Sequence, residues 1–109
     1  MSKPVALLQG TLFLLILKIL DLEPRTGWAI SQRLGQMSND ILQVSHGSLY
    51  PALHKLENEG WIQGEWKESE TGRQAKFYSL TRAGRRQLRL ETENWARLSG
   101  AINGVLESL

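Results

Sequence analysis

Residues 49–84, LYPALHKLENEGWIQGEWKESETGRQAKFYSLTRAG, constrain the fold of this chain more than any other segment. Leucines recur at helical spacing in the first part, which ends at Gly60, a residue that takes the left-handed conformation at a helix end with little strain. Two runs rich in β-favouring aromatic residues follow, on either side of a turn at Thr71-Gly72. The segment therefore predicts a helix, then a two-stranded hairpin with a charged tip, then the start of another helix.

The remainder of the chain extends this pattern to a mainly α protein with a small β-hairpin, an α+β fold. We expect helices over residues 5–21, 28–38, 46–59 and 82–108, and strands over residues 61–68 and 76–80. Ser45 and Thr81 precede the third and fourth helices with hydroxyls that can accept a first-turn amide. Pro51 lacks an amide hydrogen, so the third helix should begin near Ser48 or have irregular first turns.

Length and composition limit the chain to one small domain with an appended helix, divided here as residues 1–81 and 82–109. The absence of cysteine excludes disulfides, thiolate zinc sites and cysteine nucleophiles, and it fits a cytoplasmic protein. The longest uninterrupted apolar run near the N-terminus, residues 12–17, is far shorter than the roughly 20 residues of a membrane span. We therefore expect a buried helix there and no membrane partner.

Catalytic and metal-binding patterns are missing from the sequence. His46 and His54 lie about 12 Å apart along a helix, too far to share one metal ion, and no carboxylate is spaced to assist either. A glycine-rich phosphate-binding loop is also absent. We predict a protein that is not an enzyme and needs no cofactor or metal.

The third helix and the hairpin tip carry the candidate binding residues. With its leucines turned inward, the helix presents hydroxyl, imidazole, phenol and ammonium groups that can bond base edges or phosphates. The tip adds two cations and a glutamine, although the net charge of +2 supports DNA binding only weakly. The alternative for each feature is an ordinary solvated surface. The predicted DNA contacts are Ser45, His46, Gly47, Ser48, Tyr50, His54, Lys55, Gly72, Arg73, Gln74 and Lys76.

Nearly the whole chain, residues 5–109, resembles the PadR family of transcriptional regulators, in its short-tailed branch with a single C-terminal helix. The matching segments are LLQGTLFLLIL, GWAISQRL, GSLYPALHKLENEGWI and GRQAKFYSLTRAG. The resemblance implies a winged helix-turn-helix repressor that dimerises through its last helix and binds a palindromic operator. Tyr50 matches the tyrosine of the recognition helix, and Gly72-Arg73 match the glycine and basic residue of the wing. Gln74-Ala75 depart from the usual proline and second basic residue, which implies a weaker grip by the wing.

The last helix carries an apolar seam with coiled-coil spacing, which predicts a homodimer. Its residues are Leu88, Trp95, Leu98, Ile102, Val105 and Leu109. Trp95 matches a tryptophan with which short-tailed members bind flat aromatic compounds at the dimer interface. Two copies of Trp95 near Phe13 could form a slot for a planar apolar or aromatic effector. The alternative is simple packing of the dimer.

The sequence thus predicts a dimeric, sequence-specific DNA-binding regulator, a repressor that a planar effector could release. The rival hypothesis is a winged helix that has become a protein-interaction module and no longer binds DNA. Four arginines at the start of the last helix fit either phosphate contacts or a solvated surface: Arg82, Arg85, Arg86 and Arg89.

Overall fold

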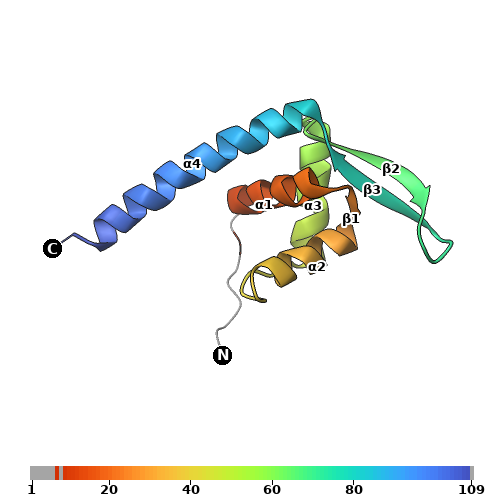
Figure 1. The fold of residues 1–109 in the computed structure, drawn as a ribbon, viewed down its shortest axis with the longest axis horizontal. Coiled ribbons are helices and arrows are strands. Elements are labelled where there is room, and N and C mark those ends of the chain that lie inside the picture. Colours follow the sequence, from red (N-terminus) through yellow and green to blue (C-terminus); the bar gives the residue numbers. More distant parts are fainter. Residues whose placement is uncertain (1–6, 8, 109) are drawn as a thin grey trace.

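The computed structural model describes residues 7 and 9–108, which form four helices and a three-stranded antiparallel sheet (Figure 1). The elements in chain order are α1 (Gln9–Leu22), β1 (Arg25–Thr26), α2 (Gly27–Met37), α3 (His46–Asn58), β2 (Ile62–Glu68), β3 (Gln74–Leu80) and α4 (Arg82–Leu106). The expected α+β arrangement, with a hairpin between the third and fourth helices, is confirmed. Across this described part of the chain, no helix is both long and apolar enough to span a bilayer.

The sheet has the strand order β1-β3-β2, with the hairpin β2-β3 extending outward from the helices (Figure 1). Its register pairs Ile62 with Leu80 at the base and Glu68 with Gln74 near the tip. Strand β1 was not predicted, because it has only two residues and directly follows Pro24. It pairs with the middle of β3 and joins the loop after α1 to the sheet.

The hydrophobic core lies where α1, α2 and α3 meet the base of the sheet. Helix α1 contributes the largest number of buried side chains: Leu12, Ile16, Leu17, Ile19 and Leu20. The first turns of α4 also belong to this core, since Gly84 and Leu88 are buried. Beyond Leu88 the helix extends away from the other helices, and most of its residues are exposed (Figure 1).

Helix α3 begins at His46, where the expected range 46–59 begins, and not near Ser48. Ser45 is the N-cap, as expected, and its hydroxyl accepts a hydrogen bond from the amide of Ser48 at 3.2 Å. Pro51 lies inside the helix, and its missing amide would have bonded the carbonyl of Gly47. Because Gly47 is exposed, solvent can satisfy that carbonyl, and the helix tolerates the proline.

The start of α4 is fixed to the connection between α3 and β2. The Thr81 hydroxyl accepts a bond from the Gly84 amide at 3.0 Å and donates one to the Gly60 carbonyl at 2.7 Å. A Cβ atom at Gly84 would collide with the backbone carbonyl of Trp61. Only glycine allows this close approach, which sets the direction in which α4 leaves the core.

Candidate nucleic-acid interface

Helix α3 buries its leucines and exposes its polar face, as its sequence predicted. Leu49, Leu53 and Leu56 are completely buried against α1, α2 and the sheet. The opposite side is a continuous solvent-exposed surface of small, polar and basic residues. It comprises Ser45, His46, Gly47, Ser48, Tyr50, Pro51, His54, Lys55 and Asn58.

Tyr50 both faces solvent and holds α2 against α3. Its side chain is 45% exposed, and its ring meets the His46 ring edge-on, with the two centroids 5.6 Å apart. The ring also lies over the start of α2, where a Cβ atom at Gly27 would be 2.9 Å from the Tyr50 Cε1 atom. Tyr50 is thus a packing residue as well as a candidate DNA contact.

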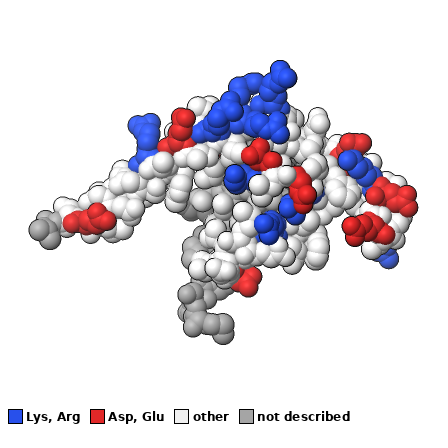
Figure 2. All heavy atoms as spheres, in the orientation of Figure 1, with Lys and Arg blue, Asp and Glu red and all other residues white. Residues whose placement is uncertain are grey.

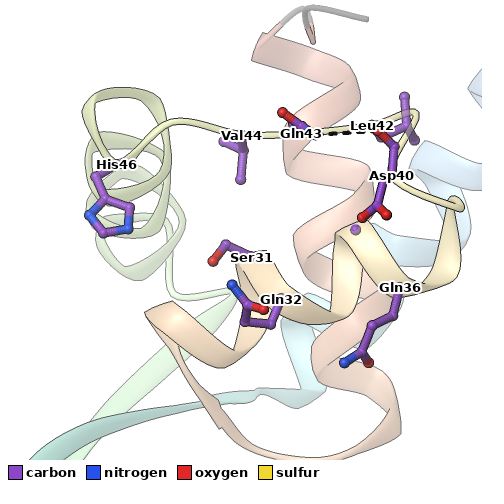
Figure 3. Close-up of a pocket in the computed structure, with 9 residues that line it drawn as sticks. Ser31, Gln32, Gln36, Asp40, Leu42, Gln43, Val44 and His46 are labelled. Atoms are coloured by element: carbon purple, nitrogen blue, oxygen red, sulfur yellow. Dashed lines mark hydrogen bonds between the residues drawn. The ribbon is translucent and has the colours of Figure 1, made fainter. Parts of the chain in front are cut away.

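A polar hollow of about 320 Å³ lies between α2 and the loop that leads into α3 (Figure 3). In this view Val44 points from the loop toward Ser31 and Gln32 on α2, while His46 lies at the start of α3. The Ser38 hydroxyl fixes the loop, because it donates to the Leu34 carbonyl at 2.8 Å and accepts from the Leu42 amide at 3.0 Å.

Three glutamines around this hollow extend the polar surface of α3 onto α2 and the loop. Gln32, Gln36 and Gln43 are all exposed and line the hollow. Sequence reasoning missed them as candidate contacts. The available signal was the spacing of Gln32 and Gln36, which places both on the outer face of α2.

Lys76 connects the wing, defined here as the hairpin β2-β3, to the recognition helix α3. Its Nζ atom lies 3.1 Å from the Glu57 Oε1 atom and 5.3 Å from the centroid of the Tyr78 ring. Gly64 leaves the room for this side chain, since a Cβ atom there would collide with the Lys76 Cε atom. The ammonium that the sequence assigned to DNA is therefore paired with a carboxylate on α3.

These contacts change the acid–base properties of both wing residues. The hydrogen bond to Glu57 raises the pKa of Lys76 above its ordinary value, against the opposing effect of burial. Burial raises the pKa of the Tyr78 hydroxyl, against the opposing effect of the Lys76 charge.

The tip of the wing is a tight turn with mixed charge. Gly72 adopts a φ of 82°, and the Ser69 amide donates to the Arg73 carbonyl at 2.7 Å. Figure 2 shows acidic and basic side chains intermixed over the wing, at the right of the view. Arg73 and Gln74 are both exposed there. With Lys76 paired to Glu57, Arg73 is the tip cation best placed to meet a phosphate.

The predicted apolar seam of α4 is largely exposed in the single chain. Trp95 is 47% exposed, and Leu98, Ile102 and Val105 are exposed at least as much. Leu88 is the exception, and its assignment to a dimer seam is wrong, because its side chain packs into the core of its own chain. Leu109 lies outside the described residues.

An apolar groove of about 610 Å³ runs between α1 and the exposed part of α4. Trp95 forms part of its wall, with Leu14 from α1 and Ile102 from α4. Phe13 is not among the lining residues and packs against the core instead. The structure thus places Trp95 in a groove suited to an apolar group but does not bring Phe13 to it.

The arginines at the start of α4 form the largest basic patch in Figure 2, at the top of the view. Arg85 pairs with Asp21 at 3.3 Å, and the other three are exposed. The patch lies near the end of α3 that is remote from His46 (Figure 1). In the described part of the chain, no group of three or more potential metal ligands occurs.

Comparison with known proteins gives a consistent result. The family model of the transcriptional regulator PadR-like family matches residues 16–90. A PadR-like transcriptional regulator from Bacillus cereus is 32% identical, with a TM-score of 0.78 over 93% of this chain and 96% of that one. A Streptococcus mutans protein is 31% identical, with a TM-score of 0.83 over 99% of this chain and 95% of that one. A transcriptional regulator from Mycobacterium tuberculosis is 40% identical over 53 residues, 49% of each chain.

The family match covers well over half of the chain, and both structural neighbours align with nearly all of it. The family consists of transcriptional regulators that bind DNA, not of enzymes. The chain therefore belongs to the PadR-like family of transcriptional regulators.

Proposed function

We propose that this regulator is a cytoplasmic homodimer that represses transcription by binding a palindromic operator. The observation that carries the proposal is the exposed polar face of α3, which continues onto the α2 hollow on one side and the wing on the other. Helix α3 would lie in the major groove, where a side chain can distinguish all four base pairs. The wing would contact the flanking backbone or minor groove.

Different parts of the surface have different proposed roles. His54 and Lys55, in the middle of the exposed face of α3, are positioned to read base edges. Ser45, His46, Gly47 and Ser48 surround the start of α3, where free amides and the helix dipole favour a phosphate. Arg73 and Gln74 supply the contacts of the wing tip. Lys76 sets the position of the wing through Glu57.

The exposed apolar stripe of α4 supports the proposed dimer, because Leu98, Ile102 and Val105 together expose an apolar patch to water in the single chain. Such patches mark surfaces that other molecules cover. We place DNA binding in residues 1–81 and dimerisation in residues 82–109. Sedimentation equilibrium should give twice the chain mass for the native protein. Leu98→Glu should give a folded protein of single mass that binds the operator weakly.

The groove beside Trp95 is the proposed effector site, for a planar apolar or aromatic compound. A tryptophan face and aliphatic walls can hold such a ligand by stacking and burial. A planar aromatic cation should quench the tryptophan emission of the native protein and much less that of Trp95→Ala. Equal quenching of both proteins would remove Trp95 from the site.

Selection of bound sequences from a random DNA pool tests the proposed function. We expect an enriched palindrome whose half-site centres are about one helical turn, 10–10.5 base pairs, apart. An enriched sequence without two-fold symmetry would contradict the dimeric arrangement. No enrichment at low salt would contradict DNA binding by this chain.

The mixed charge of the wing favours a second candidate, a module that binds proteins instead of DNA. With Lys76 paired to Glu57, the wing has no excess positive charge to attract a duplex, because Lys67 and Arg73 stand against Glu65, Glu68 and Glu70. This candidate predicts no mobility shift with DNA from its own upstream region at low salt.

A further inference from the structure

Trp66 is an exposed aromatic residue on the wing that the fold does not explain. Its side chain is 66% exposed, more than that of any other aromatic residue in the described part of the chain. A tryptophan offers a large apolar surface, and a strand position open to solvent leaves most of it unused. Folding and core packing therefore give no reason for a tryptophan at this position.

The register of the hairpin shows which way Trp66 faces. Trp66 lies directly opposite Lys76, and the next pair toward the core is Gly64 with Tyr78. Directly opposed residues share one face of a sheet, as do residues two apart on a strand. Since Lys76 on this face reaches Glu57, Trp66 lies on the face of the wing that looks toward α3.

Trp66 is the first residue on this face that the core no longer covers. Ile62 and Tyr78, nearer the base of the hairpin, are buried on it. Trp66 follows Gly64 by one two-residue step, about 7 Å farther along the strand. It therefore stands between the recognition helix and the tip of the wing.

The charged residues next to Trp66 along β2, Glu65 and Lys67, point to the other face of the hairpin, whereas Lys76 and Glu68 share the face of Trp66. Glu65 and Lys67 alternate with Trp66 along β2, and the Lys67 Nζ atom lies 5.9 Å from the centroid of the Phe77 ring on that opposite face. The apolar ring is thus separated from the acidic residue that precedes it. Toward the tip, the face of Trp66 continues with the exposed Gln74, opposite Glu68.

We infer that Trp66 contacts DNA, and this inference rests on the proposed function. With α3 in the major groove and Arg73 near the flanking backbone, the intervening nucleotides lie against this face of the wing. Most of the exposed surface of the indole ring is apolar, with one N–H donor at its edge, so we expect its main contact to be with an apolar part of the nucleotide. The apolar parts of duplex DNA that such a ring can reach are the thymine methyl group in the major groove and the edge of the deoxyribose.

Binding of the selected operator by the native protein, Trp66→Ala and Trp66→Phe tests the inference. We expect about ten-fold weaker binding by Trp66→Ala, a loss on the order of 1.4 kcal/mol. Trp66→Phe should keep most of the affinity. The slope of affinity against salt should not change in either variant, because no charge is removed. Gln63→Ala is the control, since Gln63 is exposed on the same strand but points to the other face of the hairpin.

Replacing thymine by uracil in the operator flank distinguishes the two nucleotide groups. If Trp66 contacts the methyl, the replacement weakens binding by the native protein but not by Trp66→Ala. If it contacts the deoxyribose, the replacement has the same small effect on both proteins, and Trp66→Ala remains weak on either DNA.

Equal operator binding by Trp66→Ala and the native protein would overturn the inference while leaving the proposed function intact. Equal binding accompanied by a loss of self-association would assign Trp66 to an interface between copies, which also overturns it. Failure of the native protein to bind any DNA would instead contradict the proposed function itself.

Discussion

The ion pair between Glu57 and Lys76 should measurably stabilise the fold, because it joins the recognition helix to the wing. The perturbations are Glu57→Gln and Lys76→Met, made singly and together. The two charged atoms are 3.1 Å apart, and each side chain keeps 30% of its surface exposed, so solvent screens the attraction. The pair should therefore contribute about 0.5–1 kcal/mol.

Lys76→Met should be the more destabilising change, because it also removes the cation from the Tyr78 ring. That contact, at 5.3 Å from the ring centroid, should contribute about 0.5–1 kcal/mol more. We expect losses of about 1–2 kcal/mol for Lys76→Met and about 0.5–1 kcal/mol for Glu57→Gln. The double variant should lose less than the sum of the two.

Urea denaturation followed by circular dichroism gives the free energy of unfolding of all four proteins. The control cycle uses Lys55 and Glu59, a more exposed pair at the C-terminal end of α3 with the charged atoms 3.6 Å apart, for which about 0.3–0.5 kcal/mol is expected. If the losses of unfolding free energy for Glu57→Gln and Lys76→Met were strictly additive, the two side chains would not stabilise the fold through their ion pair. A salt slope of DNA binding that falls by about 0.9 in Lys76→Met would show that Lys76 neutralises a phosphate instead.

Further predictions concern pH, the joint before α4 and the start of α3. Lys76 and Tyr78 both have a raised pKa in the folded state. The stability that they contribute is therefore complete below their ordinary pKa values of 10.5 and 10.0 and is lost as the pH rises beyond them. The urea midpoint of unfolding, measured between pH 8 and 11, should fall at the alkaline end. Gly84→Ala should destabilise the protein by about 3 kcal/mol or more, because the new Cβ atom would meet the backbone carbonyl of Trp61, just before β2. Gly104→Ala on the same helix has open space around it and should be neutral or stabilising. Thermal melts of both variants measure the difference. Ser45→Ala should lower the free energy of unfolding by about 1 kcal/mol in urea titrations, since the Ser48 amide loses its cap; an unchanged midpoint would contradict that role.

Local chemistry made much of the fold predictable from the sequence. The hairpin, expected over residues 61–68 and 76–80, occupies residues 62–68 and 74–80, because turn residues and β-favouring aromatics mark it. Ser45 and Thr81 cap α3 and α4 as expected, because a short hydroxyl side chain just before a helix can accept a hydrogen bond from a free amide of its first turn. The polar face of α3 followed from the spacing of its leucines.

The features that escaped prediction all depend on contacts between distant segments. The pairing of Lys76 with Glu57 joins residues 19 positions apart, and nothing in either local sequence indicates it. The polar hollow needs the loop before α3 to fold back over α2. Leu88 fits the seam spacing, but packing against the core decides its environment. The side of the wing that Trp66 occupies became clear only from the strand register.

The central claim, that α3 and the wing of this chain grip duplex DNA, is tested most directly by operator affinity measured at a series of salt concentrations. We predict a steep linear loss of log affinity with log salt for the native protein, and a slope smaller by about 0.9 for Arg73→Ala. Arg86→Ala removes the same charge from the start of α4 and should leave the slope unchanged. Native slopes in Arg73→Ala, or no binding by the native protein at low salt, would contradict the claim.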